Sequence, residues 1–468
     1  MAMKAALVSP PFVKDYMRNA RCDFVSLSGT QWYPILLGQC GAWLEKRGVE
    51  VLFIDAPAQG LSFEETEVRV KAFEPDWIVF YSGRLSEGSD AAFSNRLCAA
   101  TGARGVFVGP YASINPEATL SKLDAVKFVV DGEFEHPVAE LLEGRDPAQI
   151  GNLLWRGEDG TIRRNPRRPP LQRAELDAIP FVSAFFKKHL DVKTYRALSE
   201  PYPYMDILTG RGCKWGLCSY CLWVHTFARG PVYNTRSIEN VIEEMRFIEK
   251  ELPQVRSLMI QDDTFTQDRI TEFCHARLKA GLKLPWSCYC RADLSAETLQ
   301  LMKRAGALNL HVGFESADDG ILKNVRKGLT RERMTRFAVD ARSAGLRLHG
   351  DFALGFPGET RETAQATIDW ALQIRPHTAQ FQLMIPFPGT PFHDYLAQRG
   401  WLDKNGYPSY PDLSSAELES ISKRAYRRFY LHPAYFAQML AHPFETVFSR
   451  IGVYFKAVPA VFWKRYVR

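Results

Sequence analysis

The sequence lacks the features that would assign it at once to a membrane, secreted or fibrous class. Its 468 residues contain no run of about 18 uncharged apolar residues, which argues against a transmembrane helix. The opening MAMKAALVSPPF has too short an apolar run for a secretory signal. No internal repeat or low-complexity tract is found. Apolar residues make up 46% and charged residues 24%, which is typical of an ordinary globular protein of two to four domains.

The body of the chain has no net positive charge. The net charge is +6, but residues 423–468 carry nine Lys or Arg and one acid, so the remaining 422 residues sum to −2. Nucleic acid is therefore not the expected partner, because it would require basic charge on the main body. The same tail holds twelve aromatic residues. Residues 444–468 fit either a peripheral contact with an anionic membrane surface or a segment packed on the outside of the protein.

Nine cysteines stand in a chain without a recognisable secretory signal. We therefore expect a cytoplasmic protein, peripheral at the inner face of the membrane if the tail binds there. In a reducing compartment, clustered thiols are more often metal ligands or catalysts than disulfides.

Residues 1–145 alternate strand-like and helix-like segments, with a helix predicted at 34–47. This alternation indicates an α/β fold with a parallel, doubly wound (Rossmann-like) sheet. Ligands of such sheets bind beyond the carboxyl ends of the strands. The motif G-x-G-x-x-G is absent after the first strand, which argues against a dinucleotide. The predicted strands are 5–11, 49–57, 76–83, 105–110 and 125–133.

A connector, 146–202, with a turn at Asp159-Gly160, leads to a second run of alternation at 203–400. Six β/α units in sequence predict a barrel or partial (β/α)6 barrel with its active site at the carboxyl ends of the strands. A small helical region, 401–468, follows. The predicted strands are 205–210, 257–263, 286–291, 308–316, 346–356 and 379–387. The predicted helices are 237–250, 267–281, 295–306, 318–326, 331–345 and 360–374. Residues suited to cap them are Ser237, Ser295, Thr330 and Thr360.

The strongest chemical signal is a cysteine cluster directly after the first strand of the predicted barrel. Cys213, Cys218 and Cys221 form C-x4-C-x2-C within TGRGCKWGLCSYCLW. Three thiolates on one [4Fe–4S] cluster leave one iron open to a substrate or cofactor. Two other interpretations stay open: a zinc site with His225 as fourth ligand, and three unconnected free thiols. The other cysteines are expected to be structural: Cys22, Cys40, Cys98, Cys274, Cys288 and Cys290.

On these residues, the stretch 203–395 resembles the radical S-adenosylmethionine (SAM) superfamily. The resemblance implies a [4Fe–4S] cluster held by the three cysteines and SAM cleaved to a 5′-deoxyadenosyl radical. It also implies an electron donor such as flavodoxin or ferredoxin. The spacing departs from the common C-x3-C-x2-C by one residue. The resemblance implies SAM contacts at Tyr220, Asp262, Asp263, Arg291, Glu315, Ser316, Gly355 and Phe387.

The N-terminal half resembles the cobalamin-binding domain of one large subclass of these enzymes. This implies cobalamin as a third cofactor, although a doubly wound domain that has lost its ligand is the alternative. D-x-H-x-x-G is absent, and Asp55-Ala56-Pro57 follows the second strand, so no histidine is expected to reach cobalt. The resemblance implies cobalamin contacts at Trp32, Tyr33, Gly109, Pro110, Gly132 and Glu133.

Three stretches resemble the hopanoid-biosynthesis-associated radical SAM proteins: 55–62, 221–237, and 261–266 followed by 286–294. This implies a lipid-linked or other small-molecule substrate and a radical rearrangement that contracts a sugar ring. Methyl transfer to an unactivated carbon is the competing reaction, and a zinc- or corrinoid-binding protein without catalysis is the alternative of another class. No catalytic acid or base is identified, since His311 and His349 are expected to be buried, hydrogen-bonded residues.

Overall fold

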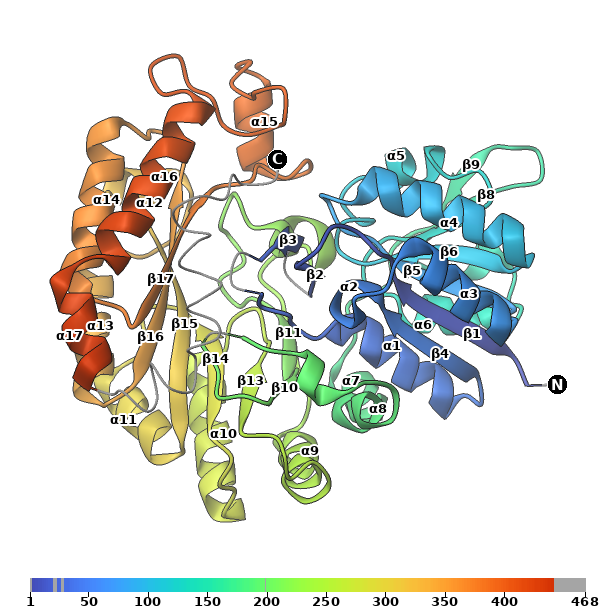
Figure 1. Cartoon of the computed structure of the whole chain (residues 1–468), viewed down its shortest axis with the longest axis horizontal. Coiled ribbons are helices and arrows are strands. Elements are labelled where there is room, and N and C mark those ends of the chain that lie inside the picture. Colours follow the sequence, from blue (N-terminus) through green and yellow to red (C-terminus); the bar gives the residue numbers. More distant parts are fainter. Residues whose placement is uncertain (1, 20–22, 27–28, 198, 442–468) are drawn as a thin grey trace.

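The computed structural model describes residues 2–19, 23–26, 29–197 and 199–441, and it shows an α/β protein with two sheets side by side (Figure 1). The predicted α/β class is confirmed. Cys22 and the segment 444–468 lie outside the described residues. Within those ranges, no helix combines the length and apolar character that a membrane span needs.

The first sheet has seven strands in the order β4-β1-β5-β6-β7-β8-β9, of which the first five are parallel. Alternate residues of a strand point to opposite faces of the sheet, and Leu7 and Val8 accordingly belong to separate hydrophobic clusters. Both faces of the sheet are therefore covered. The strands are β1 (Lys4–Ser9), β4 (Glu50–Asp55), β5 (Trp77–Tyr81), β6 (Arg104–Val108), β7 (Phe128–Val130), β8 (Leu153–Arg156) and β9 (Ile162–Arg164). The helices are α1 (Ile35–Lys46), α2 (Ala56–Gln59), α3 (Phe63–Phe73), α4 (Glu87–Thr101), α5 (Pro116–Ser121) and α6 (Glu135–Leu142).

The hairpin predicted at Asp159-Gly160 is present, but it extends the first sheet. β8 pairs antiparallel with β7, so that Val129 lies opposite Leu154, and β9 continues the ladder. The pairing covers the edge that β7 would otherwise expose. The strand predicted at 125–133 is shorter, because the chain turns away at Gly132, whose φ is +107°.

The second sheet has six parallel strands that lie side by side in chain order. They are β10 (Tyr204–Ile207), β13 (Ser257–Ile260), β14 (Trp286–Cys290), β15 (Ala307–Glu315), β16 (Arg347–Leu354) and β17 (Thr378–Leu383). The helices between them are α9 (Ile238–Glu251), α10 (Gln267–Ala280), α11 (Ala296–Arg304), α12 (Asp319–Asn324), α13 (Arg331–Ser343) and α14 (Arg361–Ile374). The four predicted caps accept a backbone N–H at the start of α9, α11, α13 and α14.

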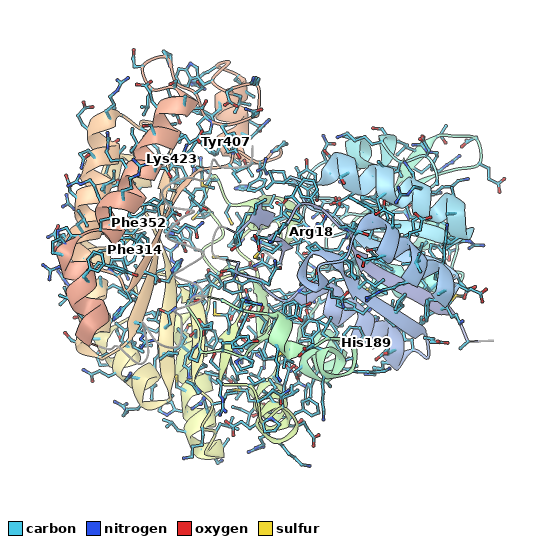
Figure 2. The ribbon with its side chains drawn as sticks, in the orientation of Figure 1. Arg18, His189, Phe314, Phe352, Tyr407 and Lys423 are labelled. Carbon is cyan, nitrogen blue, oxygen red and sulfur yellow. The ribbon has the colours of Figure 1, made fainter. Side chains whose placement is uncertain are left out.

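Helices α11, α13 and α14, with α16 (Ser415–Tyr430), cover one face of β15–β17, which we call the outer face (Figure 1). Phe314, Phe352 and Phe381 stack across three strands there, with ring centroids 5.6 and 5.1 Å apart. Trp370 of α14 packs edge-on against Phe314 and Phe352. Figure 2 labels these two phenylalanines. Since side chains alternate along a strand, the intervening residues face the opposite, inner face.

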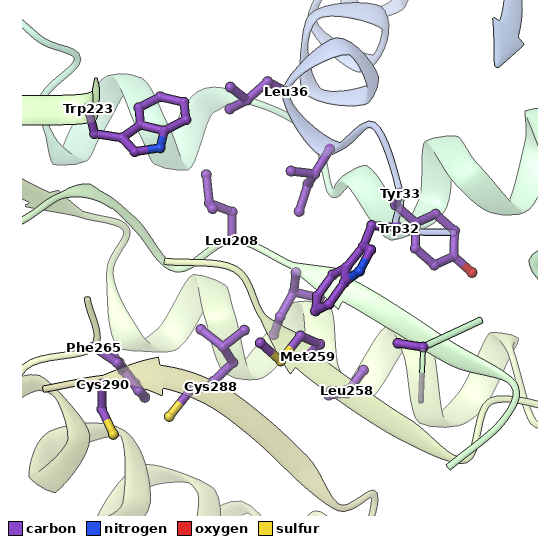
Figure 3. Close-up of a cluster of buried hydrophobic side chains, with 14 of the residues drawn as sticks. Trp32, Tyr33, Leu36, Leu208, Trp223, Leu258, Met259, Phe265, Cys288 and Cys290 are labelled. Atoms are coloured by element: carbon purple, nitrogen blue, oxygen red, sulfur yellow. The ribbon is translucent and has the colours of Figure 1, made fainter. Parts of the chain in front are cut away.

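The chain before α1 connects the two halves. After the short strands β2 (Tyr16–Arg18) and β3 (Asp23–Val25), Trp32 reaches the inner face of the second sheet, its ring centroid 6.0 Å from that of His311. Tyr33 stacks on Tyr195 at 4.0 Å, and its hydroxyl donates to the carbonyl of Tyr204 at 3.0 Å. The two halves therefore share a continuous core (Figure 3).

Two glycines of α1 allow α8 (Val182–His189) to approach closely. A Cβ at Gly38 would lie 2.4 Å from a ring carbon of Phe186, and one at Gly41 would lie 2.3 Å from Phe185. The remaining helices are α7 (Arg173–Ala178), α15 (Pro391–Ala397) and α17 (Pro433–Ala441). α16 and α17 lie in the helical region expected after the second sheet.

Candidate active site

The cysteine loop begins beyond β10 and is fixed at both ends. β11 (Gly210–Gly212) pairs with β12 (Tyr233–Thr235) in a small antiparallel ribbon. Gly212 adopts a φ of +94°, and a Cβ there would lie 2.0 Å from a backbone oxygen of the ribbon, so only glycine fits. At the far end, the Ser219 N–H donates to the Val325 carbonyl at 3.0 Å.

Cys213, Cys218 and Cys221 are half-buried, free thiols at the carboxyl ends of the strands. Burial raises the pKa of Cys221 to about 12, and the nearby Cys218 adds to that rise. Burial also raises the pKa of Cys218, against the charges of Lys327 and Arg291. In the described part of the chain the sulfurs do not form a closed metal-binding group. Binding a metal would deprotonate these thiols and close the loop around it.

His225, the alternative fourth zinc ligand, faces the backbone. Its Nε2 lies 3.0 Å from the carbonyl oxygen of Cys218, and burial lowers its pKa. This contact occupies the nitrogen that a zinc site of the Cys3His type would use, so the geometry does not favour that interpretation.

Two adjacent carboxylates follow β13 and differ in their surroundings. The buried Asp262 accepts bonds from the Thr209 N–H and hydroxyl, both at 2.6 Å, and from the Tyr233 hydroxyl at 2.7 Å. Burial raises the pKa of Asp262 despite these donors. Asp263 accepts the Gly212 N–H at 2.7 Å and lines a cavity between the two halves. Asp262 thus fixes the loop, and Asp263 is the one in a position to meet a ligand.

Three predicted SAM residues come together at the ends of β14–β16. Glu315, in a left-handed conformation with φ +63°, accepts bonds from the Tyr220 hydroxyl and the Lys327 ammonium, both at 2.9 Å. The Tyr220 ring lies 4.9 Å from that of Phe356. Arg291 donates to the Lys327 carbonyl at 3.0 Å, which adds it to the same group.

Ser316 and Gly355 are engaged in turns. The Ser316 hydroxyl accepts the Asp318 N–H at 3.1 Å. Gly355 has a φ of +95°, and its N–H donates to Glu359 at 3.2 Å. These contacts shape the backbone at the ends of β15 and β16.

A cavity that is open to solvent lies between the first sheet and the cysteine loop. Glu133, Arg211, Trp223 and Asp263 contribute to its walls. Trp223 Nε1 and Arg211 Nε are buried and have no hydrogen-bond partner within the described part of the chain. Figure 3 shows Trp223 facing Leu36. The cavity therefore presents hydrogen-bond donors to a ligand with acceptor groups.

Arg211 links the loop to the first half. Its guanidinium donates to Glu133 at 2.9 Å, to the fully buried Glu135 and to Gln39 of α1 at 2.7 Å. Arg211 stands two residues before Cys213, so the position of the cysteine loop depends on this contact.

A second cavity brings Pro110 of the first half together with Phe387 of the second. Arg18, labelled in Figure 2, also lines it and is paired with Asp90 at 2.6 Å. The neighbouring Gly109 has a φ of +109°.

The other residues implied for cobalamin lie in different surroundings. The Gly132 N–H donates to the Ser113 hydroxyl at 2.8 Å, beside Glu133 of the larger cavity. Trp32 and Tyr33 belong to the shared core and line neither of the two cavities. Asp55 is buried against Tyr195 at 2.9 Å, and burial raises its pKa to about 6.

The sequence analysis did not identify Arg211, Trp223 or Lys327 as parts of the site. Arg211 and Trp223 lie within the quoted cysteine motif, so their position was a usable signal. Lys327 stands in a loop whose place beside Glu315 depends on the tertiary fold.

Residues 207–371 match the family model described as the radical SAM superfamily. This region holds the cysteine loop and β10–β16, so the chain carries a domain of the radical SAM class of enzymes. The class uses SAM and a [4Fe–4S] cluster, so these two predicted cofactors are confirmed at the level of the class.

The chain is 29% identical to an uncharacterized methyltransferase of Pyrococcus horikoshii, over 92% of this chain and 93% of that protein. It is 27% identical to the cytidylyl-2-hydroxyethylphosphonate methyltransferase of Streptomyces wedmorensis, over 79% of each. The fold resembles the radical SAM methyltransferase TsrM of Kitasatospora setae, solved with cobalamin and a [4Fe–4S] cluster (TM-score 0.67, 20% identity, 90% of this chain and 82% of that one). Both sequence relatives are named methyltransferases, and the likeness to TsrM supports the fold. The resemblance to hopanoid-associated proteins stays a prediction.

Proposed function

We propose that the protein is a cobalamin-dependent radical SAM methyltransferase that adds a methyl group to an unactivated carbon of a small molecule. The observation that carries the proposal is the cavity between the first sheet and the cysteine loop, with its buried donors Trp223 Nε1 and Arg211 Nε. The sequence relatives are named methyltransferases, which favours methylation over the sugar-ring contraction implied by the resemblance to hopanoid-associated proteins. In this proposal, the first sheet is of the cobalamin-binding type and the second is a partial (β/α)6 barrel.

The residues present fit an iron–sulfur cluster. Three thiols stand in one loop, and glycines at 212 and 216 adopt positive φ angles that let the backbone turn tightly. Cys213, Cys218 and Cys221 would be the ligands, which leaves one iron for the amino and carboxylate groups of SAM. Asp263, which accepts the Gly212 N–H and lines the cavity, would pair with the SAM ammonium.

The residues also fit a corrin ring between the two halves. The buried N–H groups of Trp223 and Arg211 have no acceptor within the described part of the chain. The peripheral amides of cobalamin would supply acceptors to them. Asp55 stands where the family motif has its ligand region, and its carboxylate is held by Tyr195. The protein would then supply no histidine to cobalt.

When bound, cobalamin supplies methyl transfer, and the cluster with SAM supplies hydrogen-atom abstraction from the substrate carbon. The chain's own residues position these groups. Glu315, held by Tyr220 and Lys327, presents acceptor oxygens beside the cysteine loop. Arg211 fixes the loop against Glu133 and Glu135, and so sets the distance between the two cofactor regions.

An electron donor such as flavodoxin or ferredoxin would reduce the cluster. The substrate would be a small molecule or the polar head of a lipid, and a hopanoid remains one such candidate. If the substrate is a lipid, residues 444–468 would bind the membrane surface, and their deletion would abolish flotation with anionic liposomes.

The test is anaerobic reconstitution with iron, sulfide, SAM and dithionite, with and without cobalamin and with small-molecule and lipid extracts. Methylation forms S-adenosylhomocysteine together with 5′-deoxyadenosine, and the substrate gains one carbon. A rearrangement forms 5′-deoxyadenosine without S-adenosylhomocysteine and adds no carbon. A colourless, zinc-loaded protein that leaves SAM intact would refute the proposal.

A further inference from the structure

A row of polar side chains lines the inner face of β16 and β17 and has no role in the mechanism above. Burial alternates along β16: Leu348, Gly350 and Phe352 are buried, whereas His349 and Asp351 between them are half-buried. β17 repeats the pattern, with Phe381 on the outer face. The half-buried inner residues are Arg347, His349, Asp351, Thr378, Gln380 and Gln382.

The centre of this row is an imidazole–carboxylate pair. His349 Nε2 lies 3.3 Å from Asp351 Oδ1, and the two side chains keep 19% and 25% of their surface exposed. His349 Nδ1 lies 2.7 Å from the Thr378 hydroxyl on the next strand. Gln380, which lies opposite Asp351 in the register, donates to Gln382 at 2.8 Å. These groups therefore have fixed orientations, and they remain partly exposed on the inner face of the second sheet.

A second, deeper pair supports the first. The His311 ring lies 4.8 Å from that of His349, and its Nε2 lies 3.6 Å from the carboxylate of Glu200. Both members of this pair are buried, at 4% and 0% exposure. The Ser287 hydroxyl donates to Glu200 at 2.8 Å, and Trp32 packs against His311. Because His311 and Glu200 are buried beneath the first pair, a ligand would contact His349 and Asp351 first.

The row also lies next to the group expected to hold SAM. Asp351 is opposite Gly313 in the β15–β16 register, and the Glu315 carboxylate folds over that glycine. Burial acts to raise the pKa of Asp351, but His349 above all, and then His311 and Lys327, lower it. Lys327 is the residue bound to Glu315. A molecule on this row would therefore touch both the inner face and the cofactor region.

We infer that the inner face of β16 and β17 is the substrate-binding wall, and that it selects a substrate with hydroxyl or ammonium groups beside the reacting carbon. The inference rests on the proposed function. A hydrocarbon would remove water from the Asp351 carboxylate and the glutamine amides without offering them a hydrogen bond in return, which is unfavourable. A hydroxyl or ammonium group instead donates to Asp351 and is held in one orientation. A lipid tail is thereby excluded from this wall, and a polar head is accepted.

The first test uses perdeuterated glycerol as the probe, with chain-deuterated 1-pentanol as the apolar comparison. In the reconstituted enzyme, a C–D bond of the probe breaks and a C–D bond forms in 5′-deoxyadenosine. Dithionite and a proton from water then quench the carbon left behind. We expect deuterium from glycerol but little from pentanol. His349→Gln and Asp351→Asn should reduce that transfer about tenfold, the factor for losing a hydrogen bond to a charged group, with total 5′-deoxyadenosine unchanged.

The matched control is the pair His393 and Asp394 on α15, which lie 3.2 Å apart at the surface. His393→Gln and Asp394→Asn should leave deuterium transfer unchanged. Equal transfer by the inner-face variants and the wild type, transfer from pentanol as efficient as from glycerol, or no transfer from glycerol would each overturn the inference.

A second measurement requires neither SAM nor a cluster. Diethyl pyrocarbonate should modify His349 faster than the buried His311, as read by mass spectrometry of the isolated protein. Molar glycerol should slow the reaction at His349 in the wild type and not in Asp351→Asn. Reaction rates that glycerol leaves unchanged would refute the binding wall even if the enzyme proves to have another activity. Absence of 5′-deoxyadenosine in the first test would instead refute the proposed function.

Discussion

At the scale of single residues, the three loop cysteines differ from the rest by position. Cys213→Ala, Cys218→Ala or Cys221→Ala should each lower bound iron and reduce SAM cleavage to background, because the cluster loses a ligand. Cys288→Ala is the control. This thiol is buried on the outer face, where its loss leaves a small void and costs stability without affecting iron content. Colorimetric iron and sulfide counts and chromatography of 5′-deoxyadenosine measure both outcomes.

The protonation of Glu359 makes the stability of the protein depend on pH. Burial raises its pKa from 4.5 to about 7. The folded protein therefore binds this proton more tightly than the unfolded chain does. The contribution of Glu359 to the free energy of unfolding is fully present below about pH 4.5. It is lost as the pH rises to about 7, by up to about 3 kcal/mol. Glu359→Gln removes this part of the slope.

Urea unfolding at pH 5 and pH 8 measures the difference. The slope should become smaller rather than vanish, because burial also raises the pKa values of Asp55 and Asp90 to about 6. Identical slopes in Glu359→Gln and the wild type would mean that Glu359 does not titrate as described.

At the scale of elements, helix ends were readable from the sequence because they depend on local chemistry. The hydroxyls of Ser237 and Thr330 accept the backbone N–H three residues ahead, which a cap residue before an apolar-periodic stretch predicts. The β11–β12 ribbon was not predicted. Each strand has three residues, β11 contains two glycines, and the pairing depends on Asp262, beyond the end of β13, holding Thr209 and Tyr233. Such contacts carry no sequence periodicity.

The packing of α1 on α8 should be sensitive to glycine. Gly41→Val places a side chain where the Phe185 ring stands, and we expect a loss of about 1–3 kcal/mol in the free energy of unfolding. Gly88 of α4 is the matched control, because a Cβ there would meet nothing within 4 Å. Gly88→Ala should raise stability by about 0.5–1 kcal/mol through helix propensity. Similar losses in both variants, read from denaturant curves, would contradict this account.

At the scale of the whole molecule, Arg211 joins the two halves. Arg211→Ala leaves the fully buried Glu135 without its partner, and we expect a loss of about 3–5 kcal/mol. The surface pair Arg47–Glu143, with side chains 35% and 49% exposed, is the comparison. Arg47→Ala should cost no more than about 1 kcal/mol. Chemical denaturation compares the two, and equal losses would show that the buried network does not hold the halves together.

The route of the chain between β1 and α1 has a consequence for synthesis on the ribosome. The Tyr33 N–H bonds to Asp206, and the Tyr204 hydroxyl bonds to the Gln31 carbonyl, each across 173 residues. Trp32 and Tyr33 leave the exit tunnel long before their partners are translated, so the nascent first half carries exposed aromatic rings until β10 emerges. Expression in the cell should therefore depend on chaperones or on translation speed, and chimeras that exchange the second half must also carry the short aromatic stretch at 31–33.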